Sequence, residues 1–256
     1  MSATHGAAPA AMAATLVRRG IVRTKAAYRP CPSLFLYPGL TAKPWWSLSS
    51  LPSEVSAGIA KVVAARDAML QEYDALATAN PRGDYIVGES EHTLNHGKWL
   101  WHTAIAKGRM NTDFAIAAPN TMAALASVPS LLTGGIPFAY AFFSNLHSGS
   151  KIAPHFGPSN TRLRVHVPLR VPDATTTSGG ETTTRLTVAG ETREWKVGEA
   201  LIFDDSYEHC AENINGKKQD RLVLLFDLWH PDLSLNERAS VEDMFNSARR
   251  EGWLKS

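Results

Sequence analysis

The sequence predicts a mainly β domain with flanking helices, an α+β chain built around a β-sandwich or barrel. Between about residues 136 and 230, short apolar or alternating runs are separated by Gly, Pro and Asn turns, as in such folds. Helical spacing of apolar residues is found only before and after this region. At 256 residues, 44% of them hydrophobic, the chain is long enough for one large domain or two small ones.

Residues 1–32 are predicted to be a flexible N-terminal tail or an organelle transit segment. Residues 1–53 contain no Asp or Glu, whereas six Lys and Arg side chains lie between Arg18 and Lys43. An Arg-rich, acid-poor start is typical of transit peptides, and a tail without any address explains it equally well. We expect a soluble intracellular protein, cytoplasmic or, if the segment is an address, mitochondrial or in another organelle.

Ordered structure is predicted to begin near residues 33–37. Beyond it, three segments are predicted helices: 52–76, 119–127 and 236–253. In the first, Val55 and Ile59 follow helical spacing, and Pro52 suits the first turn. In the third, Asn236 is the predicted N-cap.

Strands are predicted at five runs: 138–143, 162–167, 182–188, 200–203 and 222–228. The second run alternates, so that Arg162, Arg164 and His166 would share one face of a strand and apolar residues the other. In an ordinary sandwich such a basic face would be exposed to solvent and have no binding role. The strand alone therefore leaves its role open.

A hairpin is predicted at Asn215-Gly216, because Asn-Gly is a strong turn signal. Pairing across that turn would place His209 and Arg221 near one another, opposite the alternating strand. The resulting pocket would be basic, and guanidinium groups bind carboxylates bidentately. These residues together predict a site for a small dianion.

His155 is followed two residues later by Gly157. Many oxygen-using iron enzymes place a carboxylate at that position, so that two histidines and one carboxylate hold the metal. Asp204 and Asp205, shortly before His209, are the other candidate carboxylates. Our preferred interpretation of the two aspartates is a local turn whose side chains bond the backbone.

The composition excludes several classes of function. A formal net charge of +2 is too small to indicate a nucleic-acid surface. No run of about 18 or more apolar residues predicts a transmembrane helix. Two cysteines, Cys31 and Cys210, give no disulfide framework, which fits a reducing compartment.

Several separated blocks of the sequence resemble the aspartyl/asparaginyl β-hydroxylase family. The resemblance covers roughly residues 35–235, and a match across so many blocks is far more specific than any single histidine motif. The matching positions, in order, are Trp45-Trp46, Gly108-Arg109, Asn111, Ala118-Pro119, Thr121, Ser144, 154–166, Gly198-Glu199, 203–209, Arg221-Leu222 and 227–231.

This resemblance implies a double-stranded β-helix, a jelly-roll and cupin-like barrel, in one catalytic domain over residues 33–256. It implies an Fe(II) site with two histidine ligands, His155 and His209. Gly157 stands where related enzymes carry a carboxylate, so the glycine fits the family pattern. No catalytic side chain is predicted beyond those that hold the metal and the cosubstrate.

The resemblance also implies positions for the cosubstrate 2-oxoglutarate. Arg221 and Ser144 match residues that bind its distal carboxylate. Arg164 and His166 match residues around the end that chelates the metal. Trp99 falls where the family has a tryptophan near the substrate.

The implied activity is hydroxylation with Fe(II), 2-oxoglutarate and O2, in which 2-oxoglutarate is decarboxylated to succinate. The expected substrate is an aspartyl or asparaginyl residue of a peptide or protein, or a related amino acid. The best-known members carry a membrane anchor and a helical-repeat region that this sequence does not show. The alternatives are a non-catalytic jelly-roll binding protein of the same fold and a cupin-like metal enzyme that does not use 2-oxoglutarate.

Overall fold

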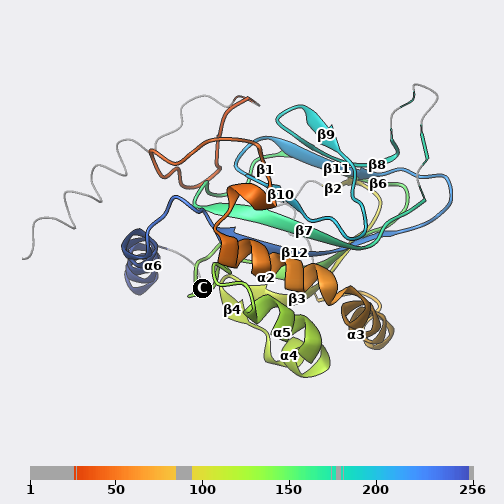
Figure 1. Cartoon of the computed structure of the whole chain (residues 1–256), viewed down its shortest axis with the longest axis horizontal. Helices are drawn as coiled ribbons and strands as arrows, with labels where there is room; N and C mark the ends of the chain where they lie inside the picture. The colour runs from red at the N-terminus through yellow and green to blue at the C-terminus, as the bar shows by residue number, and fades with distance from the viewer. Residues whose placement is uncertain are drawn as a thin grey trace, which may run out of the picture.

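The computed structural model describes residue 26 and residues 28–84, 94–173, 175–176, 180 and 182–253. In these ranges, two antiparallel β-sheets face each other and helices cover the outer face of the larger sheet (Figure 1). The predicted mainly β fold with flanking helices is confirmed. Most of the predicted tail, residues 1–25, lies outside the described ranges. Cys31 is already 1% exposed, and its N–H donates to the carbonyl of Ser206.

The larger sheet has seven strands, in the order β1-β10-β7-β12-β5-β3-β4. Their bounds are β1 Trp45–Trp46, β10 Leu201–Phe203, β7 Arg162–Arg170, β12 Arg221–Trp229, β5 Ala141–Leu146, β3 Trp99–Ala106 and β4 Arg109–Met110. The central strand β12 is buried along its whole length, as its continuous apolar run predicts. Along β7, Leu163 and Val165 face the helices, which leaves Arg164 and His166 on the opposite face.

The smaller sheet has five strands, in the order β2-β6-β11-β8-β9. Their bounds are β2 Leu94–His96, β6 Ser150–His155, β11 His209–Asn213, β8 Thr184–Val188 and β9 Glu191–Arg193. The strand predicted at residues 182–188 is confirmed as β8. Strands β1, β2, β3, β4, β6 and β9 were not predicted, and β6 carries His155 at its end.

The hairpin predicted at Asn215-Gly216 is wrong. Strand β11 pairs with β6 and β8 in the smaller sheet, whereas β12 pairs with β5 and β7 in the larger one. Asn215 Oδ1 accepts from the N–H groups of Lys217 and Gln219 at 3.1 and 3.2 Å. Lys218, not Gly216, has a positive φ, 56°. The turn is therefore longer than two residues and carries the chain from one sheet to the other.

The described helices are η1 Leu48–Ser50, α2 Ser53–Ala64, α3 Arg66–Ala79, α4 Thr112–Ala117, α5 Pro119–Ala126 and α6 Leu235–Arg250. The single helix predicted over residues 52–76 is two helices, because Ala65 breaks it with φ −79° and ψ 5°. The N-cap of α6 is Ser234, not Asn236. Ser234 and Glu237 form a capping box, each side chain bonding the other's backbone N–H.

The helix predicted over residues 119–127 is confirmed as α5, and its start is capped from another helix. The carboxylate of Glu72 in α3 accepts from the backbone N–H of Asn120 at 2.7 Å and of Thr121 at 2.9 Å. A carboxylate satisfies the unpaired N–H groups of a helix start and complements its positive end. The contact ties α3 to α5 and builds the helical layer.

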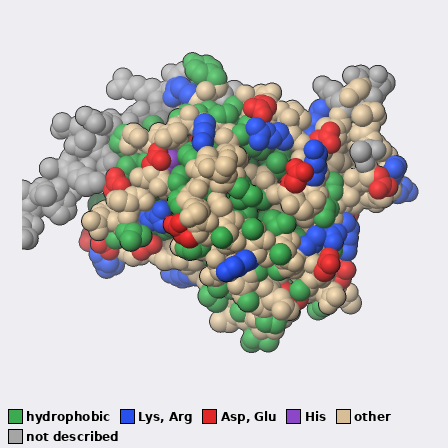
Figure 2. All heavy atoms as spheres, viewed as in Figure 1, with side chains coloured by type: hydrophobic (Ala, Val, Ile, Leu, Met, Phe, Trp, Pro, Cys, Tyr) green, Lys and Arg blue, Asp and Glu red, His purple; other side chains and the backbone are tan. Residues whose placement is uncertain are grey.

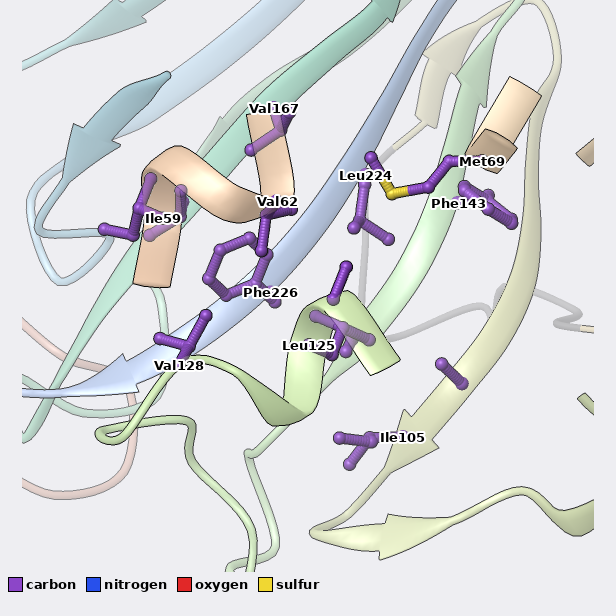
Figure 3. Close-up of a cluster of buried hydrophobic side chains, with 14 of the residues drawn as sticks. Ile59, Val62, Met69, Ile105, Leu125, Val128, Phe143, Val167, Leu224 and Phe226 are labelled. Carbon is purple, nitrogen blue, oxygen red and sulfur yellow. The ribbon is translucent and has the colours of Figure 1, made fainter. Parts of the chain in front are cut away.

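Hydrophobic packing holds the layers together. One cluster lies between the helices and the larger sheet, where Val62 of α2 and Leu125 of α5 meet Leu224 and Phe226 of β12 (Figure 3). A second cluster lies between the two sheets and includes Phe142, Leu225, Leu186 and Ala211. A third packs α6 against the end of β12. The space between the sheets is therefore the interior of a sandwich.

Charged side chains of both signs lie on the surface of the described chain. Acidic and basic side chains are interspersed on the face over the helices, without a broad basic area there (Figure 2). None of the helices in the described ranges is long and apolar enough to span a membrane.

Candidate functional site

His155 and His209 are brought together in the smaller sheet. His155 ends β6, His209 begins β11, and the two are register partners of the antiparallel pair. Their ring centroids lie 4.1 Å apart with 51° between the ring planes. The register shifts between His209 and Ala211, an irregularity of the kind that re-aims side chains beside functional sites.

The backbone fixes the tautomer of each ring. His155 Nδ1 lies 2.8 Å from the carbonyl oxygen of Ala153, and His209 Nδ1 lies 2.9 Å from that of Tyr207. A carbonyl oxygen only accepts, so Nδ1 carries the proton and Nε2 keeps the lone pair that binds metals. Burial lowers the pKa of both rings, and for His209 the neighbouring His155 lowers the pKa further. Both rings are therefore neutral at neutral pH.

Among the described residues, no carboxylate completes this pair as a metal-holding group. In the described ranges, no group of three or more His, Cys, Asp or Glu side chains could hold a metal ion. A Cβ added at Gly157 would lie 2.5 Å from Cγ and 2.7 Å from Oδ1 of Asp205. The carboxylate of Asp205 thus fills the space that a side chain at Gly157 would need.

Asp205 belongs to a buried cluster of two arginines and two aspartates. Arg162 pairs with Asp205 and, at 3.0 Å, with Asp227. Arg164 lies 2.9 Å from Asp227 and 3.4 Å from Asp205. Burial raises the pKa of Asp205, but Arg162 and Arg164 outweigh burial and hold that pKa below its ordinary value. The four charges balance, so Arg164, a predicted cosubstrate residue, already has carboxylate partners.

The interpretation of Asp204 and Asp205 as a local turn is right for only one of them. Asp204 Oδ1 accepts from the N–H of Ser206 at 2.9 Å, an Asx-turn. For Asp205 the interpretation is wrong, because its side chain binds Arg162 and Arg164, which are far away in the sequence. A fully buried carboxylate requires such charged partners.

Replacing Asp204 with Asn should stabilise the protein at higher pH. Burial raises the pKa of Asp204 from 3.8 to about 7. Between these values the folded protein holds a proton that the unfolded chain has released, so the free energy of unfolding falls as pH rises. Asn keeps the acceptor for Ser206 and cannot ionise. At about pH 8 we expect the free energy of unfolding of Asp204→Asn to exceed that of the wild type by on the order of 2 kcal/mol or more. At about pH 5 the difference between the two proteins should be much smaller.

Urea unfolding at the two pH values measures this difference. Asp67→Asn is the control, because the Asp67 side chain is 86% exposed. The same pH dependence in both variants would contradict the role given to Asp204.

Trp99, Ser144 and Arg221 meet on the adjacent strands β3, β5 and β12. Trp99 Nε1–H donates to Ser144 Oγ at 2.8 Å, and Arg221 Nη1 donates to the same oxygen at 3.3 Å. These strands are neighbours in the sheet, so the three side chains share its inner face. Trp99, predicted near the substrate, is thus bonded directly to a predicted cosubstrate residue.

Arg221 is a buried cation without a carboxylate partner. It is 1% exposed, and its guanidinium lies 4.7 Å from the ring centre of Trp195. In the part of the chain that the structure describes, it forms no salt bridge, and its Nε–H has no hydrogen-bond partner. Burial lowers the pKa of Arg221 to about 9. A charge in this situation is suited to bind an anion.

His166 lies between Trp195, which contacts Arg221, and the histidine pair. Its Nδ1 accepts from Trp195 Nε1–H at 3.1 Å, and its ring lies 5.1 Å from Phe203, which lies 5.6 Å from His209. His166 Nε2 is buried with no hydrogen-bond partner among the described residues. Sequence reasoning missed Trp195, because it lies in an irregular segment between β9 and β10 where no periodicity marks it.

The predicted site residues therefore surround one region between the sheets. Trp99, Ser144 and Arg221 lie at one end of a chain of contacts that runs through Trp195 and His166 to the histidine pair. A pocket of about 740 Å³ at the outer edge of the sandwich is lined by none of them.

Comparison with known proteins identifies the family. Residues 64–231 match the family model described as aspartyl/asparaginyl beta-hydroxylase. The aspartyl/asparaginyl beta-hydroxylase of Homo sapiens is 32% identical over 82% of this chain and 26% of its own length. The aspartate beta-hydroxylase domain-containing protein 2 of Mus musculus is 28% identical over 85% of this chain and 60% of its own length.

The chain thus spans about a quarter of the human relative and 60% of the mouse one. Among solved structures, a Pseudomonas putida prolyl-4-hydroxylase aligns with a TM-score of 0.35 at 14% identity, over 68% of this chain and 88% of that one. This structural likeness is too low to contribute to the assignment. The family model, by contrast, covers well over half of the 256 residues. The chain belongs to the aspartyl/asparaginyl β-hydroxylase family.

Proposed function

We propose that the protein is a hydroxylase dependent on Fe(II) and 2-oxoglutarate, with its site between the two sheets. One observation carries the proposal. Arg221, in the larger sheet, is a buried cation without a carboxylate partner in the described chain, and the smaller sheet carries the pair His155 and His209. A 2-oxo dicarboxylate can pair one end with a guanidinium while its other end chelates a metal.

The side chains present fit both groups. Two neutral imidazoles with lone pairs on Nε2 are suitable ligands for Fe(II). Iron bound there would supply O2 activation and hydroxylation of an unactivated carbon, with 2-oxoglutarate converted to succinate. The N–H groups at Arg221 Nε and His166 Nε2 have no partner in the described chain, and both can donate to carboxylate oxygens.

In this proposal the protein's own residues bind, orient and exclude water. Arg221 and Ser144 hold the distal carboxylate, and His166 with Arg164 holds the other end of the cosubstrate. Arg164 would contribute as part of the balanced cluster with Asp227, not as a lone cation. Buried aromatic side chains between the sheets keep water from the reacting atoms.

The proposal includes a specific architecture for the two sheets. From β5 onward the chain passes between the sheets almost strand by strand: β5, β7, β10 and β12 lie in the larger sheet and β6, β8 and β11 in the smaller one. This alternation supports a double-stranded β-helix, the jelly-roll architecture that the family resemblance implies.

The proposed substrate is an aspartyl or asparaginyl residue of a peptide or protein, or a related amino acid. The family description and the names of the human and mouse relatives support this choice. Purified protein with Fe(II) should convert 2-oxoglutarate to succinate slowly alone, and faster with Asp- or Asn-containing peptides that gain one oxygen by mass. Binding of 2-oxoglutarate without any succinate release would favour a non-catalytic binding protein.

Replacing Arg221 with Ala should raise the 2-oxoglutarate concentration needed for half-maximal turnover. The variant loses the only uncompensated cation in this set of contacts, and a charged hydrogen bond contributes about 1.5–3 kcal/mol, which corresponds to roughly 10- to 100-fold. Succinate release against 2-oxoglutarate concentration measures the effect. Arg170→Ala is the control, because the Arg170 side chain is 48% exposed and pairs with Asp74 at the surface. An unchanged requirement in Arg221→Ala would refute the role of Arg221.

A further inference from the structure

Trp195 touches both ends of the proposed cosubstrate site. Its Nε1–H donates to His166 Nδ1 at 3.1 Å, and the guanidinium of Arg221 lies 4.7 Å from its ring centre. The indole is 2% exposed and belongs to the cluster between the two sheets. One side chain therefore contacts two residues that come from different strands, β7 and β12.

The hydrogen bond to Trp195 determines which nitrogen of His166 carries the proton. An indole N–H donates and never accepts, so His166 Nδ1 must offer its lone pair. Burial, and then the charges of Arg221 and Arg164, hold the pKa of His166 well below its ordinary value, which keeps the ring neutral. A neutral ring has a single N–H, and here that group is at Nε2.

The Nε2–H of His166 is thereby presented as a donor. This atom is buried and has no hydrogen-bond partner in the described ranges, like Nε of Arg221. The side chains of His166 and Arg221 both contact the indole of Trp195, and each has a buried N–H without a partner among the described residues. Two such donors point to an anionic ligand that accepts from both. The ring face of Trp195 also stabilises the Arg221 cation, which no carboxylate of the described chain contacts.

We propose that Trp195 is a positioning residue for 2-oxoglutarate: it fixes the His166 tautomer that donates from Nε2, and its ring face holds the guanidinium of Arg221. The inference rests on the proposed function and assigns a role to a residue that sequence reasoning passed over. Trp195 acts through its two neighbours and takes no part in the chemistry itself.

Two substitutions separate the two contributions. Trp195→Phe removes the N–H and keeps an aromatic face for Arg221, whereas Trp195→Leu removes both. Anaerobic calorimetric titration of the full chain, loaded with Mn(II), with 2-oxoglutarate measures the dissociation constant. We expect it to rise about tenfold in Trp195→Phe, and about tenfold further in Trp195→Leu. The turnover number at saturating 2-oxoglutarate should fall much less than the affinity.

Nitrogen-15 NMR of histidine rings provides a readout independent of activity. The His166 signal, identified by its loss in His166→Gln, should show the Nε2–H tautomer in the wild type. In Trp195→Phe it should show a mixture of tautomers. Trp45→Phe is the matched control, because Trp45 lies in the same cluster and its Nε1–H has no hydrogen-bond partner among the described residues. Its affinity and its His166 signal should stay those of the wild type.

The outcomes distinguish this inference from the proposed function. If the wild type binds 2-oxoglutarate and Trp195→Phe matches it in affinity and tautomer, the role of Trp195 is refuted and the proposed function stands. If the wild type does not bind 2-oxoglutarate at all, both fail. Should Trp195→Leu not fold, Trp195→Phe alone still decides between these outcomes.

Discussion

Substitution of His209 by Ala should abolish succinate release, and His155→Ala should do the same. The two rings are cross-strand partners with centroids 4.1 Å apart. In the described chain no third His, Cys, Asp or Glu joins them in a metal-holding group. In a site with two protein ligands, removal of one leaves the metal with a single protein ligand. We therefore expect each loss to exceed the roughly 10- to 100-fold cost in metal affinity that follows removal of an outer-shell partner.

Metal content and turnover should be measured on the same preparations. Each alanine variant should lose bound iron on dialysis under conditions in which the wild type keeps it, and succinate release should fall with it. His147→Ala is the control, because His147 is a part-exposed histidine that pairs with Asp220 at 3.2 Å and is neither of the two proposed ligands. Thermal unfolding shows whether the variants remain folded. A His155→Ala, His209→Ala double variant with wild-type turnover would refute the assignment of both ligands.

The faces of individual strands could be predicted from the sequence better than the way in which the chain brings the strands together. Alternation along β7 correctly placed Arg164 and His166 on one face, because strand geometry is local. The pairing of His209 with His155 depends on which strands become neighbours. The predicted hairpin would have joined β11 to β12, and the turn at Asn215 instead separates them into two sheets.

The pairing of arginines with aspartates in the site could not be predicted from any local sequence pattern. From the sequence, the basic face looked like one pocket with several free cations. In the structure Asp205 and Asp227 neutralise Arg162 and Arg164, and the paired residues lie 41 to 65 positions apart in the sequence. Among Arg162, Arg164 and Arg221, it is Arg221 that has no acidic partner in the described chain. Long-range pairing therefore decides which cation serves a ligand.

Introducing Asp at Gly157 should not create a three-ligand iron site, although the position is the one where related enzymes carry a carboxylate. The new Cβ would lie 2.5 Å from Cγ of Asp205, which two buried arginines hold in place. A second buried carboxylate beside the first would also be unbalanced. We expect Gly157→Asp to lower the free energy of unfolding by on the order of 3–5 kcal/mol, without any gain in iron retention. Urea unfolding and metal content measure both effects.

Moving the carboxylate from residue 205 to residue 157 distinguishes steric from electrostatic causes of the lost stability. Asp205→Gly alone should also be strongly destabilised, because it leaves Arg162 and Arg164 with too few negative charges. Combined with Gly157→Asp, it frees the space and returns a carboxylate within reach of the same arginines. The double variant should therefore be more stable than either single one. If Gly157→Asp alone retained wild-type stability and held iron more tightly, the new carboxylate would have reached the metal, and Asp205 could not be what occupies that space.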